Sequence, residues 1–406
     1  MTNKNCLICN YKIKVFVDFG MMPIANAFTK KPTTNNYLFD MKTGFCPKCK
    51  MVQLLYQPPK EMMFHDNYAF YSSTSKSMIT HFENLSIEVE KNYLESKNDL
   101  IVEIGSNDGI LIQNFKKKGY QCIGVEPSKN VAEVSKKKGI NTINSFFDLN
   151  LANKILSTQG KAKIILSANV LCHIPYIHSI FEGIKNLLSD KGVYIFEDPY
   201  LGDVLDKTSF DQIYDEHVFL FSALSVSYLA KLYDLEIIDL SPQVTHGGSM
   251  RYTLAKIGSF TKNKIVDTII SNEKKIGLDQ YLSFNKFSEN IDSIGKELFT
   301  LLSELKKQGK KVVGYGATSK STTVNNYFNI NSDLIDCIYD TTPIKQNTYT
   351  PGTNIPVLSY SNFHKSNPDY VLLYAWNHKD EIIKKEKKFM AENRKWITYI
   401  PKVEIF

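Results

Sequence analysis

The sequence predicts an α/β protein with a small cysteine-rich module at its start and two domains built on parallel sheets. A strand, a glycine-rich turn, a helix and a second strand follow one another over residues 100–128. A second unit of this kind begins at Lys311, and two Cys-x-x-Cys pairs lie near the N-terminus. We place the cysteine-rich module in residues 1–70, the first α/β domain in 71–257, and linker helices with the second α/β domain in 258–406.

The composition is that of a globular protein. With 406 residues the chain is long enough for two or three domains, and 43% of its residues are hydrophobic. No run of about 18 apolar residues occurs, and the opening MTNKNCLICN lacks the features of a signal peptide. We therefore expect a cytoplasmic protein with no membrane partner. The net charge of +7 is modest at this length and is compatible with an anionic ligand such as a nucleotide.

Four of the seven cysteines have the spacing of metal ligands. Cys6 and Cys9 form the first Cys-x-x-Cys pair, and Cys46 and Cys49 form the second. Two such pairs supply the four thiolates of a closed tetrahedral zinc site, which is structural because no coordination position remains for water. A redox-active pair is the alternative, but two pairs near one terminus argue against it. The odd number of cysteines, without an export signal, also argues against disulfides.

Residues 100–128, LIVEIGSNDGILIQNFKKKGYQCIGVEPS, organise the first α/β domain. LIVEIG is an apolar run with β-branched residues that ends in glycine, which is typical of a buried parallel strand. The turn from Gly105 to Gly109 contains residues that tolerate unusual backbone angles, and the helix after it stops at Gly119. The second strand ends at Glu126, where an acid can accept hydrogen bonds from both hydroxyls of a ribose. A ligand is therefore expected at the carboxyl ends of the strands.

The turn differs from a dinucleotide-binding loop. Asn107 stands where such loops have their second glycine, and Glu103 would repel a phosphate but suit an ammonium group. An adenosyl ligand that carries an amino acid fits better than NAD, although a purely structural unit remains the alternative. The segment resembles motif I of the Rossmann-like S-adenosylmethionine-dependent methyltransferases, whose ribose-binding acid matches Glu126. Cofactor contacts are expected from the residues of the turn and of the strand tips, namely Glu103, Gly105, Ser106, Asn107, Gly109, Glu126, Pro127, Ser128 and Asn169.

Three further stretches carry polar residues where a substrate could bind. His173 follows the fourth strand of the domain, beside the expected methyl donor, although most histidines in such places are core or capping residues. Tyr214, Glu216 and His217 lie close together before a clear helix and offer a hydroxyl donor, a charge and a proton acceptor. A solvated loop is the alternative for them. Tyr68 belongs to the aromatic stretch FHDNYAFYSS, which is either a surface loop or a lid over the ligand.

A long helix and a second α/β domain follow Gly258. Apolar residues at steps of three and four predict one helix that packs on a neighbouring domain, namely Phe284, Phe287, Ile291, Ile294, Leu298 and Leu301. A strand, a glycine turn and a helix then begin at Lys311, and the next strand ends in Asp340. Ser319 replaces the third glycine of a dinucleotide loop, so a phosphate at Thr318–Ser321 is expected rather than a dinucleotide.

The order of these motifs along essentially the whole chain resembles the sugar C-methyltransferases, which methylate keto intermediates of nucleotide-linked deoxysugars. The motifs are CxxC…CxxC, E-x-G-x-N-x-G, N-x-L-C-H-I-P, Y-x-E-H-x-x-x-F-S, H-G-G-S-x-R and a C-terminal G-x-G-A. The resemblance implies an N-terminal zinc-binding module, a central Rossmann-like class I methyltransferase domain and a C-terminal Rossmann-like domain that helps to hold the nucleotide sugar. One departure is Ser321, where the family tends to have glycine.

The resemblance also implies the chemistry. His217 is then the base that removes the proton from C3 of a 4-keto sugar, and Tyr214, Glu216, His173 and Tyr68 surround the substrate. Glu216 is expected to orient the imidazole, and Tyr214 or His173 to bond the enolate oxygen. We expect S-adenosylmethionine as methyl donor, one structural zinc ion, a nucleotide-linked keto-sugar as substrate, and a monomer or small homo-oligomer.

Two other functions are compatible with the sequence. An O-methyltransferase that acts on a nucleotide sugar would use the same donor and a histidine base but would need no adjacent ketone. A nucleic-acid-binding protein or RNA methyltransferase is suggested by the zinc ligands and the positive charge. The sequence has no arginine-rich stripe with interleaved aromatic residues, so we expect no nucleic-acid partner.

Overall fold

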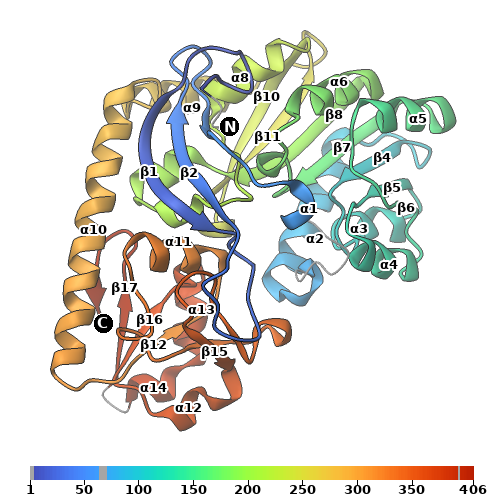
Figure 1. Cartoon of the computed structure of the whole chain (residues 1–406). Coiled ribbons are helices and arrows are strands. Elements are labelled where there is room, and N and C mark those ends of the chain that lie inside the picture. The colour runs from blue at the N-terminus through green and yellow to red at the C-terminus, as the bar shows by residue number, and fades with distance from the viewer. Residues whose placement is uncertain (1–3, 64–70, 392–393) are drawn as a thin grey trace.

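The computed structural model describes residues 4–63, 71–391 and 394–406, which form three sheets and the helices around them (Figure 1). The three regions expected from the sequence are present: the cysteine-rich module, a middle α/β domain and a C-terminal α/β domain. Among the helices of the described part, none is both long and apolar enough to cross a membrane.

The N-terminal module is an antiparallel sheet of four strands in the order β1-β2-β3-β9. Its strands are β1 (Lys14–Pro23), β2 (Leu38–Phe45), β3 (Val52–Leu54) and β9 (Phe219–Leu220). β9 comes from far along the chain, and its Phe219 pairs with Gln53 of β3. The sheet is thereby joined to the segment that carries His217, the predicted base.

The middle domain has a seven-stranded sheet in the order β10-β11-β8-β7-β4-β5-β6, in which β11 alone runs antiparallel to its neighbours. The strands are β4 (Leu100–Ile104), β5 (Gln121–Val125), β6 (Thr142–Ile143), β7 (Ala162–Ala168), β8 (Leu188–Pro199), β10 (Leu235–Gln243) and β11 (Ser249–Lys256). This is the Rossmann-like class I arrangement. The strand, turn, helix and strand predicted over residues 100–128 are confirmed as β4, α3 (Ile112–Lys117) and β5.

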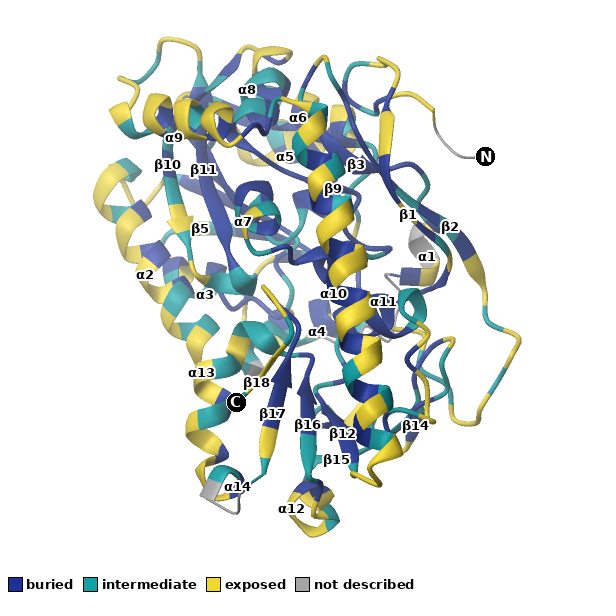
Figure 2. Ribbon diagram, turned by 90° about the vertical axis from the view of Figure 1, so that its left-hand side faces the viewer, coloured by how far each residue is buried: buried dark blue, intermediate teal, exposed yellow. Residues whose placement is uncertain are grey.

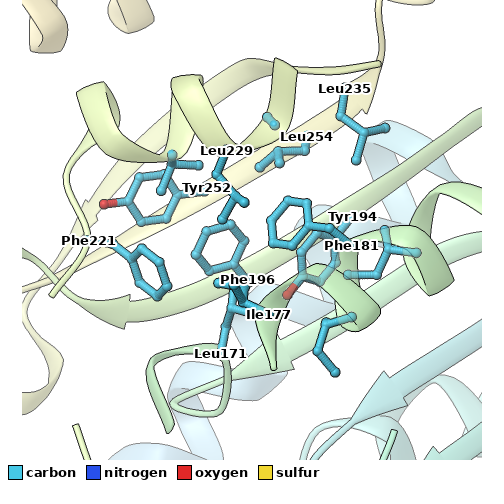
Figure 3. Packing of buried hydrophobic residues seen from close by; sticks show 14 of the residues in the cluster. Leu171, Ile177, Phe181, Tyr194, Phe196, Phe221, Leu229, Leu235, Tyr252 and Leu254 are labelled. Atoms are coloured by element: carbon cyan, nitrogen blue, oxygen red, sulfur yellow. The ribbon is translucent and has the colours of Figure 1, made fainter. Parts of the chain in front are cut away.

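Helices cover both faces of the middle sheet. α2 (Lys76–Tyr93) and α3 pack on one face. The opposite face is covered by α5 (Leu149–Gln159), α6 (Ile177–Leu187), α8 (Ala223–Lys231) and α9 (Lys264–Lys275). Large aromatic side chains fill the core under this second layer, where the rings of Phe196 and Tyr252 stack with centroids 4.6 Å apart (Figure 3). The short helices α1 (Lys60–Met63), α4 (Lys129–Lys137) and α7 (Leu201–Asp206) complete the described helices before α9.

The predicted long helix is α10 (Tyr281–Lys307), which runs along the side of the molecule with its exposed residues facing outward (Figure 2). The predicted apolar stripe is buried except for Leu301, which is half-buried, and Leu302 and Leu305 extend it. Phe284 packs between the rings of Phe16 and Phe45, with centroid distances of 4.9 and 4.6 Å. α10 therefore links the C-terminal domain to the N-terminal sheet, as the sequence predicts.

The C-terminal domain has a second seven-stranded sheet in the order β14-β15-β13-β12-β16-β17-β18, with five parallel strands in the middle and antiparallel edges. Its strands are β12 (Val312–Tyr315), β13 (Ile338–Asp340), β14 (Thr348–Tyr349), β15 (Pro356–Ser359), β16 (Tyr370–Leu373), β17 (Lys395–Thr398) and β18 (Glu404–Ile405). Its helices are α11 (Ser319–Tyr327), α12 (Phe363–Ser366), α13 (Lys379–Lys385) and α14 (Lys387–Ala391). α11 lies directly below the ends of β1 and β2 (Figure 1).

Candidate active site

The two Cys-x-x-Cys pairs come together in the N-terminal module. The four sulfur atoms all lie within 4.8 Å of one another, and the Cys6–Cys49 and Cys9–Cys46 pairs have Sγ–Sγ distances of 3.4 Å. A tetrahedral zinc ion with Zn–S bonds of about 2.3 Å needs sulfur atoms about 3.8 Å apart. A disulfide bond needs about 2.05 Å. The spacing of the four sulfur atoms fits a metal ion and does not fit disulfides.

The two Cys-x-x-Cys pairs share a backbone conformation, and their thiolates need a cation to balance their negative charge. Asn10 and Lys50 have positive φ angles of 55° and 63° and donate their N–H groups to the carbonyls of Cys6 and Cys46, both at 2.9 Å. Hydrogen bonds from the neighbouring thiols lower the pKa of Cys46, whereas hydrogen bonding to Cys46 raises the pKa of Cys6 and Cys49. Four thiolates at this spacing require a cation, and Zn²⁺ is the ion that such a set prefers.

The turn after β4 lies at the carboxyl end of the middle sheet. The N–H groups of Gly105 and Ser106 donate to the Val125 carbonyl of β5 at 2.8 and 3.1 Å. Gly105 has a φ of +68°, and a Cβ atom there would lie 2.3 Å from the Val170 side chain, so this position requires glycine. Asn107 has a φ of +47°, which asparagine tolerates better than most residues. The turn therefore keeps the backbone close to the strand tips.

Glu126 lies at the tip of β5 and faces this turn. Its two carboxylate oxygens accept hydrogen bonds from the N–H groups of Asn107, at 2.9 Å, and Ser128, at 2.8 Å. Each oxygen keeps further acceptor capacity for a ribose hydroxyl. Burial raises the pKa of Glu126, and the two backbone donors counteract the shift. Among the other predicted cofactor residues, Gly105, Asn107, Pro127 and Asn169 are partly exposed, and Ser106, Gly109 and Ser128 are buried.

Glu103 has a structural task in addition to its predicted contact with the cofactor. It is buried, and one of its carboxylate oxygens accepts a hydrogen bond from the Ile112 N–H at 3.0 Å, at the start of α3. Burial raises the pKa of Glu103 well above its usual range. The contact with an ammonium group stays a prediction.

The described end of the stretch expected to be either a surface loop or a lid lies against the turn. The Ser72 N–H donates to Asn107 Oδ1 at 3.0 Å, and the Ser73 hydroxyl donates to Asp108. Asn130 at the start of α4 donates to the Tyr71 hydroxyl at 2.8 Å. Residues 71–73 are therefore held against the turn and the start of α4. Tyr68, predicted to contact the substrate, lies outside the described residues.

His217 is almost fully buried, with 6% of its surface exposed, and both of its ring nitrogens have partners. Nδ1 lies 2.6 Å from the carbonyl oxygen of Gln212, and Nε2 lies 2.9 Å from the Tyr214 hydroxyl. A carbonyl oxygen only accepts hydrogen bonds, so Nδ1 carries the proton and Nε2 keeps its lone pair. Burial and the neighbouring His173 lower the pKa of His217 well below its usual value. The imidazole is therefore a neutral base whose basic nitrogen is Nε2.

Glu216 does not orient the imidazole as the sequence suggested, because its carboxylate has another partner. Glu216 Oε1 accepts a hydrogen bond from Asn26 Nδ2 at 3.0 Å, and the same amide nitrogen donates to Ser319 Oγ at 2.9 Å. The orienting contact of His217 comes from the Gln212 carbonyl instead. Residues 214–217 form a turn in which the His217 N–H donates to the Tyr214 carbonyl at 3.0 Å, and the side chains of Glu216 and His217 take different partners there.

Asn26 belongs to a loop of the N-terminal module that joins all three regions at this point. The Ala25 N–H donates to Asp215 Oδ1 at 2.8 Å, and the Ala25 carbonyl accepts from Thr322 Oγ1 of α11 at 2.9 Å. With the two contacts of Asn26, this loop connects the Asp215–Glu216 segment to the first turn of α11. Neither Asn26 nor Gln212 was predicted from the sequence, since no local pattern marks them.

His173 follows β7, as predicted, and lies beside His217. The two imidazole rings stack with centroids 5.2 Å apart and an interplanar angle of 16°. Burial lowers the pKa of His173 to about 4, so its ring is neutral at physiological pH. The Cys172 thiol also lies near these rings, with its sulfur within 4.8 Å of a nitrogen of each. Burial raises the pKa of that thiol and keeps it protonated.

The C-terminal domain adds a lysine to this junction. Lys320, in the first turn of α11, is 9% exposed and donates to Asn377 Oδ1 at 2.9 Å. Its ammonium lies 4.5 Å from the centre of the Trp376 ring, and the Trp376 indole N–H donates to Asp211 at 2.7 Å. From the sequence, Lys320 is only one residue of the glycine turn and helix that begin the second α/β domain, and no pattern marks it as a site residue.

The arrangement brings a neutral imidazole, a phenol and a cation together beside the strand tips of the middle sheet. Such a set can remove a proton from carbon when the resulting negative charge on a neighbouring oxygen is stabilised by placed donors. The zinc ligands are structural, since all four protein positions of a closed site are filled by cysteine.

Three family models match consecutive parts of the chain. They are described as "Putative zinc binding domain" over residues 6–64, "Methyltransferase domain" over residues 83–240 and "C-methyltransferase C-terminal domain" over residues 244–401. The C-methyltransferase NovU of Streptomyces niveus is 29% identical over 405 residues, which cover 98% of this chain and 96% of NovU. A crystal structure of an S-adenosylmethionine-dependent methyltransferase from Anabaena variabilis is 16% identical, covers 43% of this chain and 84% of its own, and has a TM-score of 0.34.

These matches follow the chain in the order of the three regions described above. The middle match contains the turn at Gly105 and the acid Glu126, and the first match contains all four cysteines. The cofactor is accordingly S-adenosylmethionine. The chain belongs to the C-methyltransferases that combine an N-terminal zinc-binding domain, an S-adenosylmethionine-dependent methyltransferase domain and a C-terminal C-methyltransferase domain.

Proposed function

We propose that this enzyme methylates C3 of a nucleotide-linked 4-keto deoxysugar and thereby forms a branched-chain sugar. The observation that supports this most strongly is the fixed tautomer of His217. With Nδ1 bonded to the Gln212 carbonyl at 2.6 Å, Nε2 is the basic nitrogen, and its lone pair accepts the Tyr214 hydroxyl at 2.9 Å until substrate takes that place. A carbon next to a ketone is acidic enough for such a base when the enolate is stabilised.

The reaction then has two steps on the substrate. His217 Nε2 takes the proton from C3, the electron pair of the C–H bond forms a C3–C4 double bond, and the π pair of the C4 carbonyl moves onto its oxygen to give the enolate. S-adenosylmethionine supplies, when bound, an electrophilic methyl group on its sulfonium centre. The enolate carbon forms the new C–C bond as the methyl–sulfur bond breaks, and the ketone is restored. The Tyr214 hydroxyl, 2.9 Å from Nε2, is placed to donate to the substrate oxygen once substrate is bound.

The C-terminal domain supports a nucleotide as the remaining part of the substrate. Asp340 at the tip of β13 accepts the Ala317 N–H at 2.7 Å, much as Glu126 accepts the Asn107 N–H at 2.9 Å in the middle domain. The same strand-tip acid beside a glycine turn therefore occurs in both sheets. In α/β folds such a position is where nucleotides bind. The predicted phosphate site at Thr318–Ser321 lies next to it.

The test is hydrogen exchange without methyl transfer. The enzyme, with S-adenosylhomocysteine in place of the donor, is incubated in deuterated water with candidate nucleotide-linked 4-keto sugars. We expect deuterium at C3 in the wild type and its loss, together with loss of methylation, in His217→Asn. A general base contributes about 10²–10⁴-fold, so the loss is readily measured. His364→Asn, which changes a half-exposed histidine of the C-terminal domain, is the matched control.

Three outcomes would contradict this function. Methyl transfer to a sugar hydroxyl without C3 exchange indicates an O-methyltransferase. Tight RNA binding that weakens steeply with salt, without activity on sugars, indicates an RNA-directed enzyme. Turnover of His217→Asn near the wild-type rate moves the base to another residue, with His173 as the first candidate.

A further inference from the structure

Lys320 is a buried cation whose hydrogen-bonding capacity is largely unused. Its ammonium has three donors, and one of them is taken by Asn377 Oδ1 at 2.9 Å. Of the carboxylates in the described residues, none has an oxygen within 4.0 Å of this nitrogen. The Trp376 ring lies 4.5 Å from the ammonium, and the acidic group whose charge acts on Lys320 is Asp211, whose Oδ2 already accepts from the Trp376 indole at 2.7 Å and from the Tyr399 hydroxyl at 2.6 Å. A buried charge with so little compensation is costly to keep, which points to a ligand.

The surroundings of Lys320 place it at the reacting end of the site. Its charge acts on the imidazoles of His217, His246 and His378, which come from three different segments around it. The preceding residue, Ser319, is joined through Asn26 to Glu216, next to His217. His246 adopts a left-handed conformation, with a φ of +55°, in the H-G-G-S turn. Such a conformation is strained for histidine, and strain of this kind concentrates at functional sites.

We propose that the ammonium of Lys320 contacts the keto oxygen of the substrate and stabilises the negative charge that this oxygen acquires when His217 removes the neighbouring proton. The inference rests on the proposed function and names Lys320 as the cation that stabilises the enolate formed in that reaction. The C–H electron pair forms the C3–C4 double bond, the carbonyl π pair moves onto the keto oxygen, the proton goes to His217 Nε2, and the charge on Lys320 offsets the charge on the oxygen. The lysine gains and loses no proton in this step.

The state of Lys320 is suited to this role. Burial lowers its pKa to about 8, and Asp211 counteracts the shift. The lysine is therefore mostly charged near neutral pH and loses its charge as the pH rises through about 8. The titratable groups that face Lys320 are Asp211, His217, His246 and His378. All three histidines have a lowered pKa, so they are neutral in this pH range. Activity should consequently fall on the alkaline side as Lys320 deprotonates.

The experiment compares the wild type with Lys320→Met and Lys320→Arg. It measures C3 exchange with S-adenosylhomocysteine, kcat and KM for the keto-sugar, and the affinity for nucleoside diphosphates without sugar. Lys320→Met should lower exchange and kcat by about 10²–10³-fold, as loss of one oxyanion donor does elsewhere. Its affinity for nucleoside diphosphates should stay within about twofold, because Lys320 is proposed to contact the keto oxygen of the sugar and not the nucleotide. Lys310→Met, at an exposed lysine before β12, controls for the loss of one positive charge.

Lys320→Arg keeps the charge at every accessible pH, so it should recover part of the activity and remove the alkaline decline. An Arg variant with the wild-type alkaline decline contradicts the inference, and this readout remains if Lys320→Met does not fold. If Lys320→Met loses affinity for nucleoside diphosphates but keeps a normal kcat, Lys320 binds the phosphates, and the inference is overturned. Normal exchange in Lys320→Met overturns this inference alone. Absence of exchange in the wild type overturns the proposed function and this inference with it.

Discussion

Asn26 provides a direct test of whether the zinc-binding module supports the active site, because one amide group joins Glu216 to Ser319. Asn26→Ala removes both hydrogen bonds. A bond to a charged group contributes about 1.5–3 kcal/mol and a neutral bond about 0.5–1.5 kcal/mol, which sum to about 2–4.5 kcal/mol. Because Asn26 itself is exposed, the stability loss should lie at the lower end of this range, at about 2 kcal/mol. Glu216, whose pKa burial already raises, loses the donor that keeps this pKa down.

The assay combines thermal unfolding with steady-state kinetics. We expect a lower Tm and a kcat reduced about tenfold or more, because misplacement of catalytic groups is costly even at small distances. Affinity for S-adenosylhomocysteine should be unchanged, since the adenosyl site is predicted at the tips of β4 and β5. Asn35→Ala, at an exposed position of the same loop, should leave both quantities at wild-type values. Wild-type kcat and Tm in Asn26→Ala would refute the idea that this loop holds the catalytic segment in place.

Three further predictions concern metal, cofactor and pH. Purified protein should contain about one zinc ion per chain by metal analysis, and Cys46→Ser should lose the metal and unfold at lower temperature; active protein without metal would contradict this. Glu126→Ala should weaken S-adenosylhomocysteine binding by about 1–3 kcal/mol in calorimetry, and unchanged affinity would move the adenosyl site elsewhere. Because folding lowers the pKa of His173 from 6.5 to about 4, that histidine stabilises the fold above pH 6.5 and the contribution is lost as pH falls towards 4. Acid titration of unfolding should show this loss, and His173→Gln should reduce it.

Local patterns in the sequence were sufficient to predict the zinc ligands, the β4–turn–β5 unit and α10. Each depends on residues close together in the chain: the Cys-x-x-Cys spacing, the glycines at 105 and 109, and the apolar stripe from Phe284 to Leu298. The chain also places His173 and His217 side by side, although 44 positions separate them in the numbering. His173 lies just beyond the end of β7, whereas His217 precedes β9 of the N-terminal sheet, so their proximity depends on the contact between two different sheets.

The contacts that hold the site could not be predicted, because they join segments that are distant in sequence. β9 completes a sheet whose other strands lie more than 150 positions earlier, and Asn26 contacts Glu216 across 190 positions. The role expected for Glu216 was wrong for a related reason. Sequence adjacency suggested a contact with His217, but the backbone directs the two side chains to different partners, and a main-chain carbonyl, which carries no sequence signal, orients the imidazole.

The most direct test of the central claim is the position of the transferred methyl group. S-adenosylmethionine labelled with ¹³C in its methyl group is incubated with the enzyme and a nucleotide-linked 4-keto deoxysugar, and the product is examined by NMR. The account predicts a labelled methyl group bonded to C3 in the wild type and no labelled product in His217→Asn. A labelled methyl group on a sugar oxygen, or C3-methylated product formed by His217→Asn at the wild-type rate, would contradict it.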